Sequence, residues 1–216
     1  IGTVLESIKA RKKPINTTNI DGRGVKNLTF QLNFNTMTKL TNCLEDFQIY
    51  LGTYRKYNES SIFGAWLNLS DYSDFEELEK AMKELHKDEE EPEFMFQDYE
   101  TSQFFINQNL ICEGYISREI YKIVEKFNDS NLDFEIIEAF SDCFGQFTDI
   151  DELLEKVSEN YYGSYDSDED FAESFLQEIG AIPENLPNYV YIDWERTARD
   201  LMFDFSSSGK HYFRSF

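Results

Sequence analysis

The chain is poor in the side chains on which most metal sites depend. It has two histidines, His86 and His211, and three cysteines, Cys43, Cys112 and Cys143, in 216 residues. The cysteines show no Cys-x-x-Cys spacing, and neither histidine has a second ligand at a metal-site spacing. We therefore expect no metal and no cofactor, two surface histidines, and reduced, buried thiols of a cytoplasmic protein.

Motifs of common catalytic and nucleotide-binding sites are also missing. There is no Gly-x-Ser-x-Gly nucleophile motif, no phosphate-binding loop and no Gly-x-Gly-x-x-Gly fingerprint. Because histidine is so scarce, a nucleophile would have almost no histidine to serve as its general base. We expect that the protein is not an enzyme.

Long apolar runs are absent as well. No stretch approaches the roughly 18 apolar residues of a membrane-spanning helix, and no signal peptide is visible. We therefore expect a cytoplasmic protein without a membrane partner. Aromatic residues are abundant at 16%. Since each large ring buries much area, small layers can be stabilised by few residues.

Positive charge is scarce outside the first part of the chain. The sequence has 42 acidic and 20 basic residues, a net charge of −22. Residues 1–46 hold seven Lys/Arg and four Asp/Glu, a net of +3, whereas residues 47–216 hold 13 and 38, a net of −25. Such a surface repels itself and costs stability. Yet residues 47–216 are rich in Phe, Tyr, Leu and Ile, unlike a disordered acidic tail. We infer a folded protein that does not bind nucleic acid directly and suits a basic partner.

Hydrophobic patterning divides the chain into four parts. We interpret residues 1–46 as an N-terminal extension, with one strand predicted at 28–34 and a flexible arm as the alternative. Residues 47–100 predict an α+β domain with strands at 47–54, 62–69 and 94–99, a loop at 55–61 and a helix at 73–87. Ser73 and Glu76 form a capping-box pattern for that helix, and a solvated acidic loop at 88–91 follows it.

The second half of the chain is mostly helical in pattern. Residues 101–162 predict a helical domain with helices near 116–127, 132–144 and 150–157, the last capped by Asp149. Residues 163–216 predict a C-terminal α+β domain. Its helix at 167–179 stops at Gly180, a second helix covers 192–202, and a strand covers 211–216. The whole is predicted to be an α+β fold.

Acidic residues gather on the polar faces of the predicted helices. They recur on the helix at 73–87, on the helix at 132–144 and on the helix at 167–179. Most have no basic partner four residues away, although an ordinary solvated face remains the plain alternative. A net charge of −25 corresponds to the phosphates of roughly a dozen base pairs of DNA. A rigid array of carboxylates could therefore occupy a DNA-binding groove.

The acidic run at 166–170 is the best candidate for a calcium loop. It lacks the glycine and the bidentate glutamate of an EF-hand. Its acids also suit the positive end of a helix dipole, with Ser167 as the cap. We favour the helix N-terminus over a calcium site.

Several stretches, in order, match one known family. They are Phe47–Tyr54, Tyr57-Asn58, Gly64-Ala65-Trp66, Phe94–Glu100 with Gln97 where histidine is usual, Phe171–Gly180 followed by Pro183, Leu186 and Pro187, Tyr191-Ile192-Asp193, and Ala198-Arg199-Asp200-Leu201. Over residues 47–216 the chain thus resembles the ArdA antirestriction proteins; the extension lies outside the resemblance. The resemblance implies an elongated, three-domain mimic of bent B-form DNA. It also implies a homodimer joined through its C-terminal part, which blocks type I restriction–modification enzymes by filling their DNA groove.

On this basis we predict two sets of interaction residues, with the specificity and modification subunits of a type I enzyme as partners. The carboxylates expected on the DNA-mimicking surface are Asp74, Glu76, Glu77, Glu79, Glu84, Glu89, Glu90, Glu91, Asp98, Glu135, Glu138, Asp142, Asp168, Glu169, Asp170, Glu173 and Glu178. The aromatic residues expected at the dimer interface are Tyr161, Tyr162, Tyr165, Tyr189, Tyr191 and Trp194. Two other functions stay open: an acidic immunity or chaperone-like module for another basic partner, and a hydrolase that uses carboxylates and a divalent metal.

Overall fold

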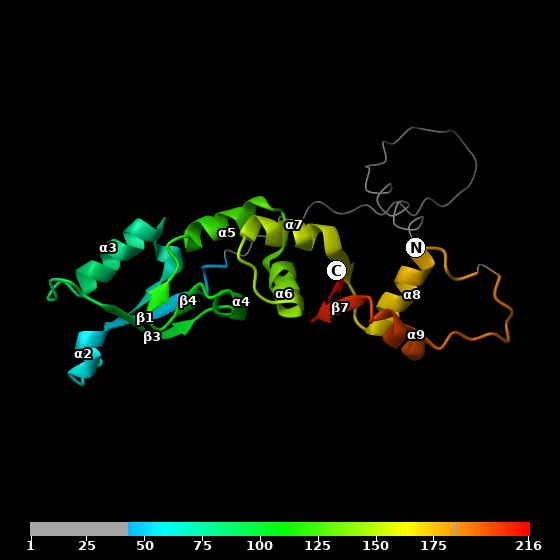
Figure 1. Ribbon diagram of the computed structural model, residues 1–216, viewed down its shortest axis with the longest axis horizontal. Helices are drawn as coiled ribbons and strands as arrows, with labels where there is room; N and C mark the ends of the chain where they lie inside the picture. Colours follow the sequence, from blue (N-terminus) through cyan, green and yellow to red (C-terminus); the bar gives the residue numbers. More distant parts are fainter. Residues whose placement is uncertain (1–42, 184) are drawn as a thin grey trace, which may run out of the picture. The chain divides into compact units, whose positions relative to one another are not determined.

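The computed structural model of the chain describes residues 43–183 and 185–216 (Figure 1). These residues form helices together with small antiparallel sheets, which confirms the predicted α+β class. The strand predicted at 28–34 lies outside the described residues. In the part of the chain that the structure describes, no helix has the length and apolar character needed to cross a membrane.

The first sheet confirms the three strands predicted for residues 47–100. Its strands are β1 (Gln48–Thr53), β2 (Ala65–Asn68) and β3 (Phe94–Glu100), in the order β2-β1-β3, with both pairs antiparallel. Strand β2 is shorter than predicted. It begins only after Gly64, whose backbone lies so close to Leu51 O that a Cβ there would meet the carbonyl oxygen at 2.4 Å.

The loop predicted at 55–61 is wrong, because the chain forms a short helix there, α2 (Tyr54–Asn58). Thr53 caps this helix, since its Oγ1 accepts a hydrogen bond from Lys56 N at 3.3 Å. Five residues are too few to show a helical period. The side-chain cap and tertiary contacts fix this helix instead.

Helix α3 (Phe75–Leu85) follows the short 3-10 turn η1 (Leu69–Asp71). Its cap is shifted by one residue from the prediction. Asp74 accepts from Glu77 N at 2.9 Å, while the backbone N and the hydroxyl of Ser73 donate to the Glu77 carboxylate. The capping pair is therefore Asp74 and Glu77 rather than Ser73 and Glu76.

The middle of the chain contains the three predicted helices and a hairpin that the pattern does not show. The helices are α5 (Ile120–Asp129), α6 (Phe134–Phe144) and α7 (Ile150–Asn160), the last capped by Asp149 as predicted. Before them lie α4 (Gln103–Asn107) and the two-residue strands β4 (Ile111–Cys112) and β5 (Tyr115–Ile116). Elements this short leave no periodic signal.

The last part of the chain is a three-stranded sheet with two helices. Strands β6 (Tyr161–Ser164), β7 (Phe205–Ser208) and β8 (His211–Arg214) pair in the order β6-β8-β7. Of these strands, the sequence predicts only β8. Helix α8 (Asp168–Glu178) starts at the Ser167 cap and ends before Gly180, which has a positive φ of 68°. Helix α9 (Trp194–Leu201) packs against α8.

Among the described residues, two clusters of buried side chains form the core. The larger contains residues from each of the three predicted domains, among them Phe47, Phe104, Phe140 and Phe213. The smaller is built on Phe171, with Phe205 and Tyr212. The predicted boundary at residues 100/101 therefore falls between elements of one hydrophobic cluster. Helix α6 packs on β7 and β8, which fixes the acidic face of α6 beside the last sheet.

Candidate protein-interaction surface

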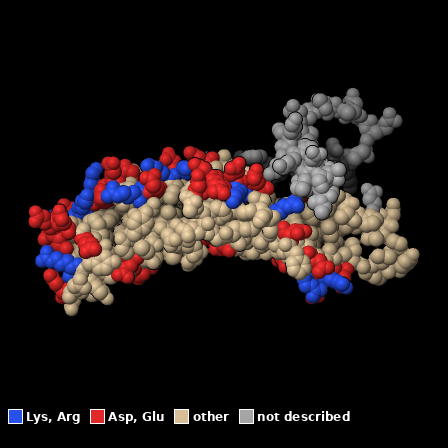
Figure 2. Space-filling view, in the orientation of Figure 1, with Lys and Arg blue, Asp and Glu red and all other residues tan. Residues whose placement is uncertain are grey.

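In Figure 2 acidic side chains gather along the upper edge and at the left end, with Lys and Arg among them, while most of the face between is neither acidic nor basic. Most of the predicted interaction carboxylates are exposed; Glu79, Glu138 and Glu169 are half-buried, and Glu89 is buried. Their surroundings differ from one helix to the next, and the difference lies in the basic side chains beside them.

The carboxylates of α3 are partly neutralised within the chain. Glu79 pairs with Arg118 and, at 3.5 Å, with Lys83, and Glu84 pairs with Lys87 at 2.6 Å. Helices α5 and α7 carry similar pairs, such as the one between Lys126 and Asp151. A basic partner that approaches this face meets lysine ammoniums as well as carboxylates.

The carboxylates of α6 and α8 differ in this respect. Neither helix contains a lysine or arginine. In the described ranges, no lysine or arginine forms an ion pair with any of their acids. These acids are Glu135, Glu138 and Asp142 on α6, and Asp168, Glu169, Asp170, Glu173 and Glu178 on α8. Several of them have neutral contacts, such as that of Asp168 with the hydroxyl of Tyr212 at 2.6 Å.

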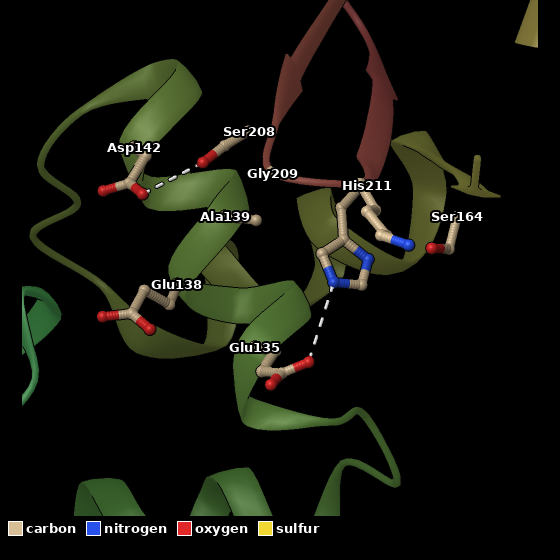
Figure 3. Close-up of a pocket in the computed structure, with 9 residues that line it drawn as sticks. Glu135, Glu138, Ala139, Asp142, Ser164, Ser208, Gly209 and His211 are labelled. Carbon is tan, nitrogen blue, oxygen red and sulfur yellow. Dashed lines mark hydrogen bonds and ion pairs between the residues drawn. The ribbon is translucent and has the colours of Figure 1, made fainter. Parts of the chain in front are cut away.

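The α6 acids line one side of a groove of about 360 Å³, with the hairpin of β7 and β8 on the other (Figure 3). Asp142 accepts from the Ser208 hydroxyl at 3.1 Å, and His211 Nε2 lies 4.0 Å from Glu135. The other nitrogen of His211, Nδ1, contacts the hydroxyl of Tyr161 at 3.1 Å. His211 is therefore a half-buried part of this groove rather than a free surface side chain.

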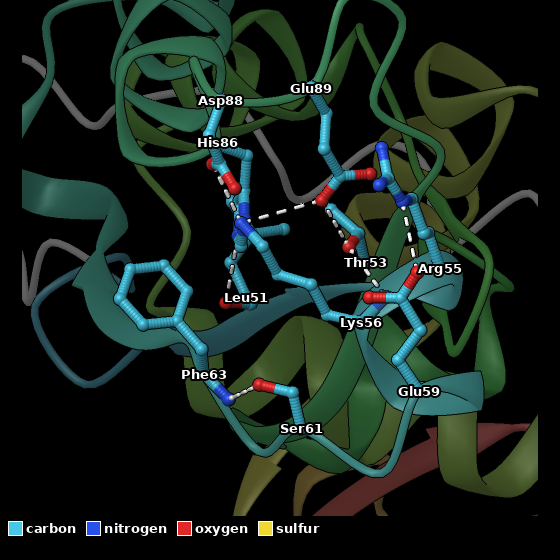
Figure 4. A network of polar contacts seen from close by, with 10 residues as sticks. All are labelled: Leu51, Thr53, Arg55, Lys56, Glu59, Ser61, Phe63, His86, Asp88 and Glu89. Carbon is cyan, nitrogen blue, oxygen red and sulfur yellow. Dashed lines mark hydrogen bonds and ion pairs between the residues drawn. The ribbon is translucent and has the colours of Figure 1, made fainter.

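The prediction that His86 lies on the surface and that Glu89 belongs to a solvated loop is wrong. His86 is fully buried, and the Glu89 side chain is 6% exposed. Both face the ammonium of Lys56 (Figure 4). Burial without a partner would be costly for Glu89, and Lys56 supplies the opposite charge at 3.4 Å. Glu89 is thus an internal ion-pair partner and leaves the set of interaction carboxylates.

Five residues make up what we call the Lys56 network: Thr53, Lys56, His86, Asp88 and Glu89. The ammonium contacts Asp88 at 2.8 Å, His86 Nδ1 at 3.0 Å and Glu89 at 3.4 Å. Since an ammonium only donates, Nδ1 accepts, and the Nε2–H of His86 faces Leu51 O at 3.4 Å. The hydroxyl of Thr53 donates to Glu89 at 2.7 Å.

The same residues offer a set of atoms that could ligate a metal. One atom each from His86, Asp88 and Glu89 lies within 4.8 Å of the others. Zinc needs ligand distances of about 2.0–2.2 Å. The contacts to Lys56 Nζ are longer and match hydrogen bonds, so the cluster has the size of an ammonium site, and the chain's own lysine occupies it.

The acidic run at 166–170 is a helix N-terminus, as favoured from the sequence. Ser167 Oγ accepts from Asp170 N at 3.1 Å. Asp166 pairs with Lys210, and Asp168 accepts from Tyr212. Two of its carboxylates thus have partners inside the protein.

Hydrogen bonds and burial shift several pKa values. The bonds from Ser73 hold the pKa of Glu77 below its usual value, and the bond from Lys56 does the same for the pKa of Asp88. Burial raises the pKa of the Cys43 thiol to about 12 and that of the Cys143 thiol to about 11. All three cysteines are free, but Cys43 and Cys143 are half-buried and Cys112 is exposed, which corrects the expectation of buried thiols.

The aromatic residues predicted at a dimer interface fall into two groups. Tyr161, Tyr162 and Tyr165 are half-buried and contact rings of their own chain, for example Tyr162 against Phe205 at 5.1 Å. Trp194 is also half-buried, whereas Tyr189 and Tyr191 are 81% and 87% exposed. Of the six predicted residues, only Tyr189 and Tyr191 offer large exposed aromatic surfaces.

Comparison with known proteins gives a match at the level of the family. The family model described as "Antirestriction protein (ArdA)" matches residues 49–213, from within β1 to within β8. A comparison with curated proteins found no match.

Proposed function

The chain belongs to the ArdA family of antirestriction proteins, and from this premise we propose that it inhibits type I restriction–modification enzymes as an acidic mimic of DNA. In this proposal its carboxylates occupy the groove in which the specificity and modification subunits bind DNA. Lysines and arginines that would hold phosphates bind carboxylates instead, and the release of counter-ions favours association.

The observation that carries the proposal is the distribution of lysine and arginine side chains around the carboxylates. Helices α6 and α8 present eight carboxylates, and among the described residues none of them pairs with a lysine or arginine. If the charged side chains served only the stability of the fold, acids and bases would be expected to alternate along the helix surface. Acids on two helices that form no ion pair with a lysine or arginine among the described residues are instead suited to cations that another molecule supplies.

The proposal includes an assembly and a location. We propose a cytoplasmic homodimer, with Tyr189 and Tyr191 at its interface because exposed aromatic side chains anchor interface cores. We also propose the three units 47–100, 101–162 and 163–216. The protein acts without catalysis, since it need only fill a groove.

A competition titration tests the proposal. Purified specificity and modification subunits are bound to labelled cognate DNA, and the protein is added at several salt concentrations. Displacement of the DNA, with an affinity that falls steeply as salt rises, supports mimicry. Simultaneous binding of DNA and protein would contradict it and favour an acidic module for another surface.

A further inference from the structure

The turn between α3 and β3 carries acidic side chains that face in opposite directions. Asp88 is 62% exposed, and Glu90 and Glu91 are exposed, while Glu89 between them points inward. The turn is closed by a hydrogen bond from Glu89 N to His86 O at 2.9 Å. The direction of Glu89 therefore sets where its exposed neighbours lie.

The Lys56 network holds this turn against the first sheet. Lys56 lies on α2, and each of its three contacts, to His86, Asp88 and Glu89, reaches the turn. Two of these contacts, to His86 and Asp88, are hydrogen bonds, and the third, to Glu89 at 3.4 Å, is an ion pair. The Lys56 side chain is only 12% exposed, and Phe63 covers it, with the ring centroid 4.6 Å from Nζ (Figure 4).

Further contacts fix the position of the network itself. Thr53, at the end of β1, caps α2 and donates to Glu89, so one hydroxyl joins the strand, the helix and the turn. His86 faces the carbonyl of Leu51 in β1. After the acidic residues 88–91, just before β3, the backbone N of Tyr54 donates a hydrogen bond to Glu93 O at 3.0 Å.

We propose that Lys56 is a positioning residue for the interaction surface: its buried ammonium fixes the turn so that Glu90 and Glu91 meet the basic groove of the partner. This inference rests on the proposed function. It gives a positive charge a favourable role in a protein that binds through negative charge.

A positioning role predicts that the loss of Lys56 changes binding affinity in the direction opposite to that expected from net charge alone. Lys56→Met makes the protein more negative by one charge, which by long-range attraction alone would strengthen binding to a basic partner. Positioning predicts weaker binding, because the turn loses its fixed place. Lys87→Met is a matched control: it removes the same charge two residues before Glu89, from a side chain that is 72% exposed and pairs with Glu84.

The test measures competition with DNA for the specificity and modification subunits. We expect Lys56→Met to bind at least about threefold more weakly than the wild type, a coupling of the size seen between contacting residues. Lys87→Met is expected to bind as tightly as the wild type or more tightly. Lys56→Met alone leaves the buried Glu89 carboxylate without an opposite charge, which can unfold the protein. Adding Glu89→Gln removes that charge, so that the effect of losing Lys56 can be measured in a folded protein.

A double-mutant cycle separates positioning from general loss of stability. The loss of affinity caused by Glu90→Gln with Glu91→Gln is measured twice, once in the wild type and once in the variant that combines Lys56→Met with Glu89→Gln. We expect the loss to be smaller in the variant, because the two carboxylates are then misplaced. A merely structural role of Lys56 leaves the two losses equal.

The outcomes distinguish this inference from the function on which it rests. If the wild type does not compete with DNA, the proposed function fails and the inference falls with it. If the wild type competes but Lys56→Met binds like Lys87→Met, or the two losses are equal, only the positioning role is overturned.

Discussion

Nδ1 of His86 lies 3.0 Å from Nζ of Lys56, so a buried histidine accepts a hydrogen bond from a buried cation. Protonation of His86 would remove that acceptor and place two positive charges in contact. Nearby Asp88 and Glu89 offset only part of this repulsion, since desolvation and Lys56 lower the pKa of His86 below 6.5.

This relationship predicts a loss of stability in weak acid. Between the lowered folded pKa and the unfolded value of about 6.5, the unfolded chain binds a proton that the folded chain does not. The contribution of His86 to stability is therefore complete above about pH 6.5 and declines as pH falls toward the folded pKa. Thermal unfolding from about pH 7.5 to about pH 5.5 would show it. The His86→Gln variant lacks this decline, and an identical profile for both proteins would contradict the prediction.

Inhibition should depend on many carboxylates, and the α8 carboxylates should contribute more to binding than those of α3. Glu173→Gln alone is expected to change the binding free energy by about 1 kcal/mol or less. Neutralising Glu169, Asp170, Glu173 and Glu178 together should cost far more than neutralising Glu76, Glu77, Glu79 and Glu84, because two of the latter already pair with bases. Competition titrations at one salt concentration compare the two sets. Abolition of binding by one substitution in a folded variant would indicate a different mechanism.

The protein should be a dimer at micromolar concentration. Replacing Tyr189 and Tyr191 by serine is expected to give monomers with an unchanged far-ultraviolet circular dichroism spectrum, because both side chains lie outside the core. Light scattering measures the mass. A wild-type monomer with full inhibitory strength would rule out the proposed interface.

Chelators and divalent ions should leave inhibition unchanged apart from ionic strength. In the part of the chain that the structure describes, His86, Asp88 and Glu89 form the cluster that could hold a metal, and His86 and Asp88 already bind the ammonium of Lys56. Weak cation binding to so many carboxylates is expected, and matched sodium chloride should reproduce its effect on the unfolding temperature. A rise with micromolar zinc or calcium that sodium chloride fails to reproduce would reveal a specific site and revive the hydrolase alternative.

Sequence patterns predicted the long helices and missed the short elements. Helices α5, α6 and α7 each bury one apolar face, so their spacing is visible in the sequence. Helix α2 and strands β4 and β5 span two to five residues, and caps and tertiary contacts decide their form. Strand β7 resembles a serine-rich turn in sequence because only Phe205 of its four residues is buried.

The Lys56 network was missed for a different reason. A charged run such as 88–91 is ordinarily solvated, and composition cannot reveal that one member turns inward. One signal was present: Leu78, Met82 and His86 continue the spacing of the buried face of α3. That spacing, extended past the end of the helix, places His86 in the interior.

The absence of bases from α6 and α8 has a thermodynamic consequence. Holding these like charges together stores free energy in the folded chain, and dissolved salt lowers it by screening. Salt also weakens the attraction between the same carboxylates and a basic partner. Sodium chloride should therefore act in opposite directions on two equilibria, raising the unfolding temperature of the free protein while loosening its complex.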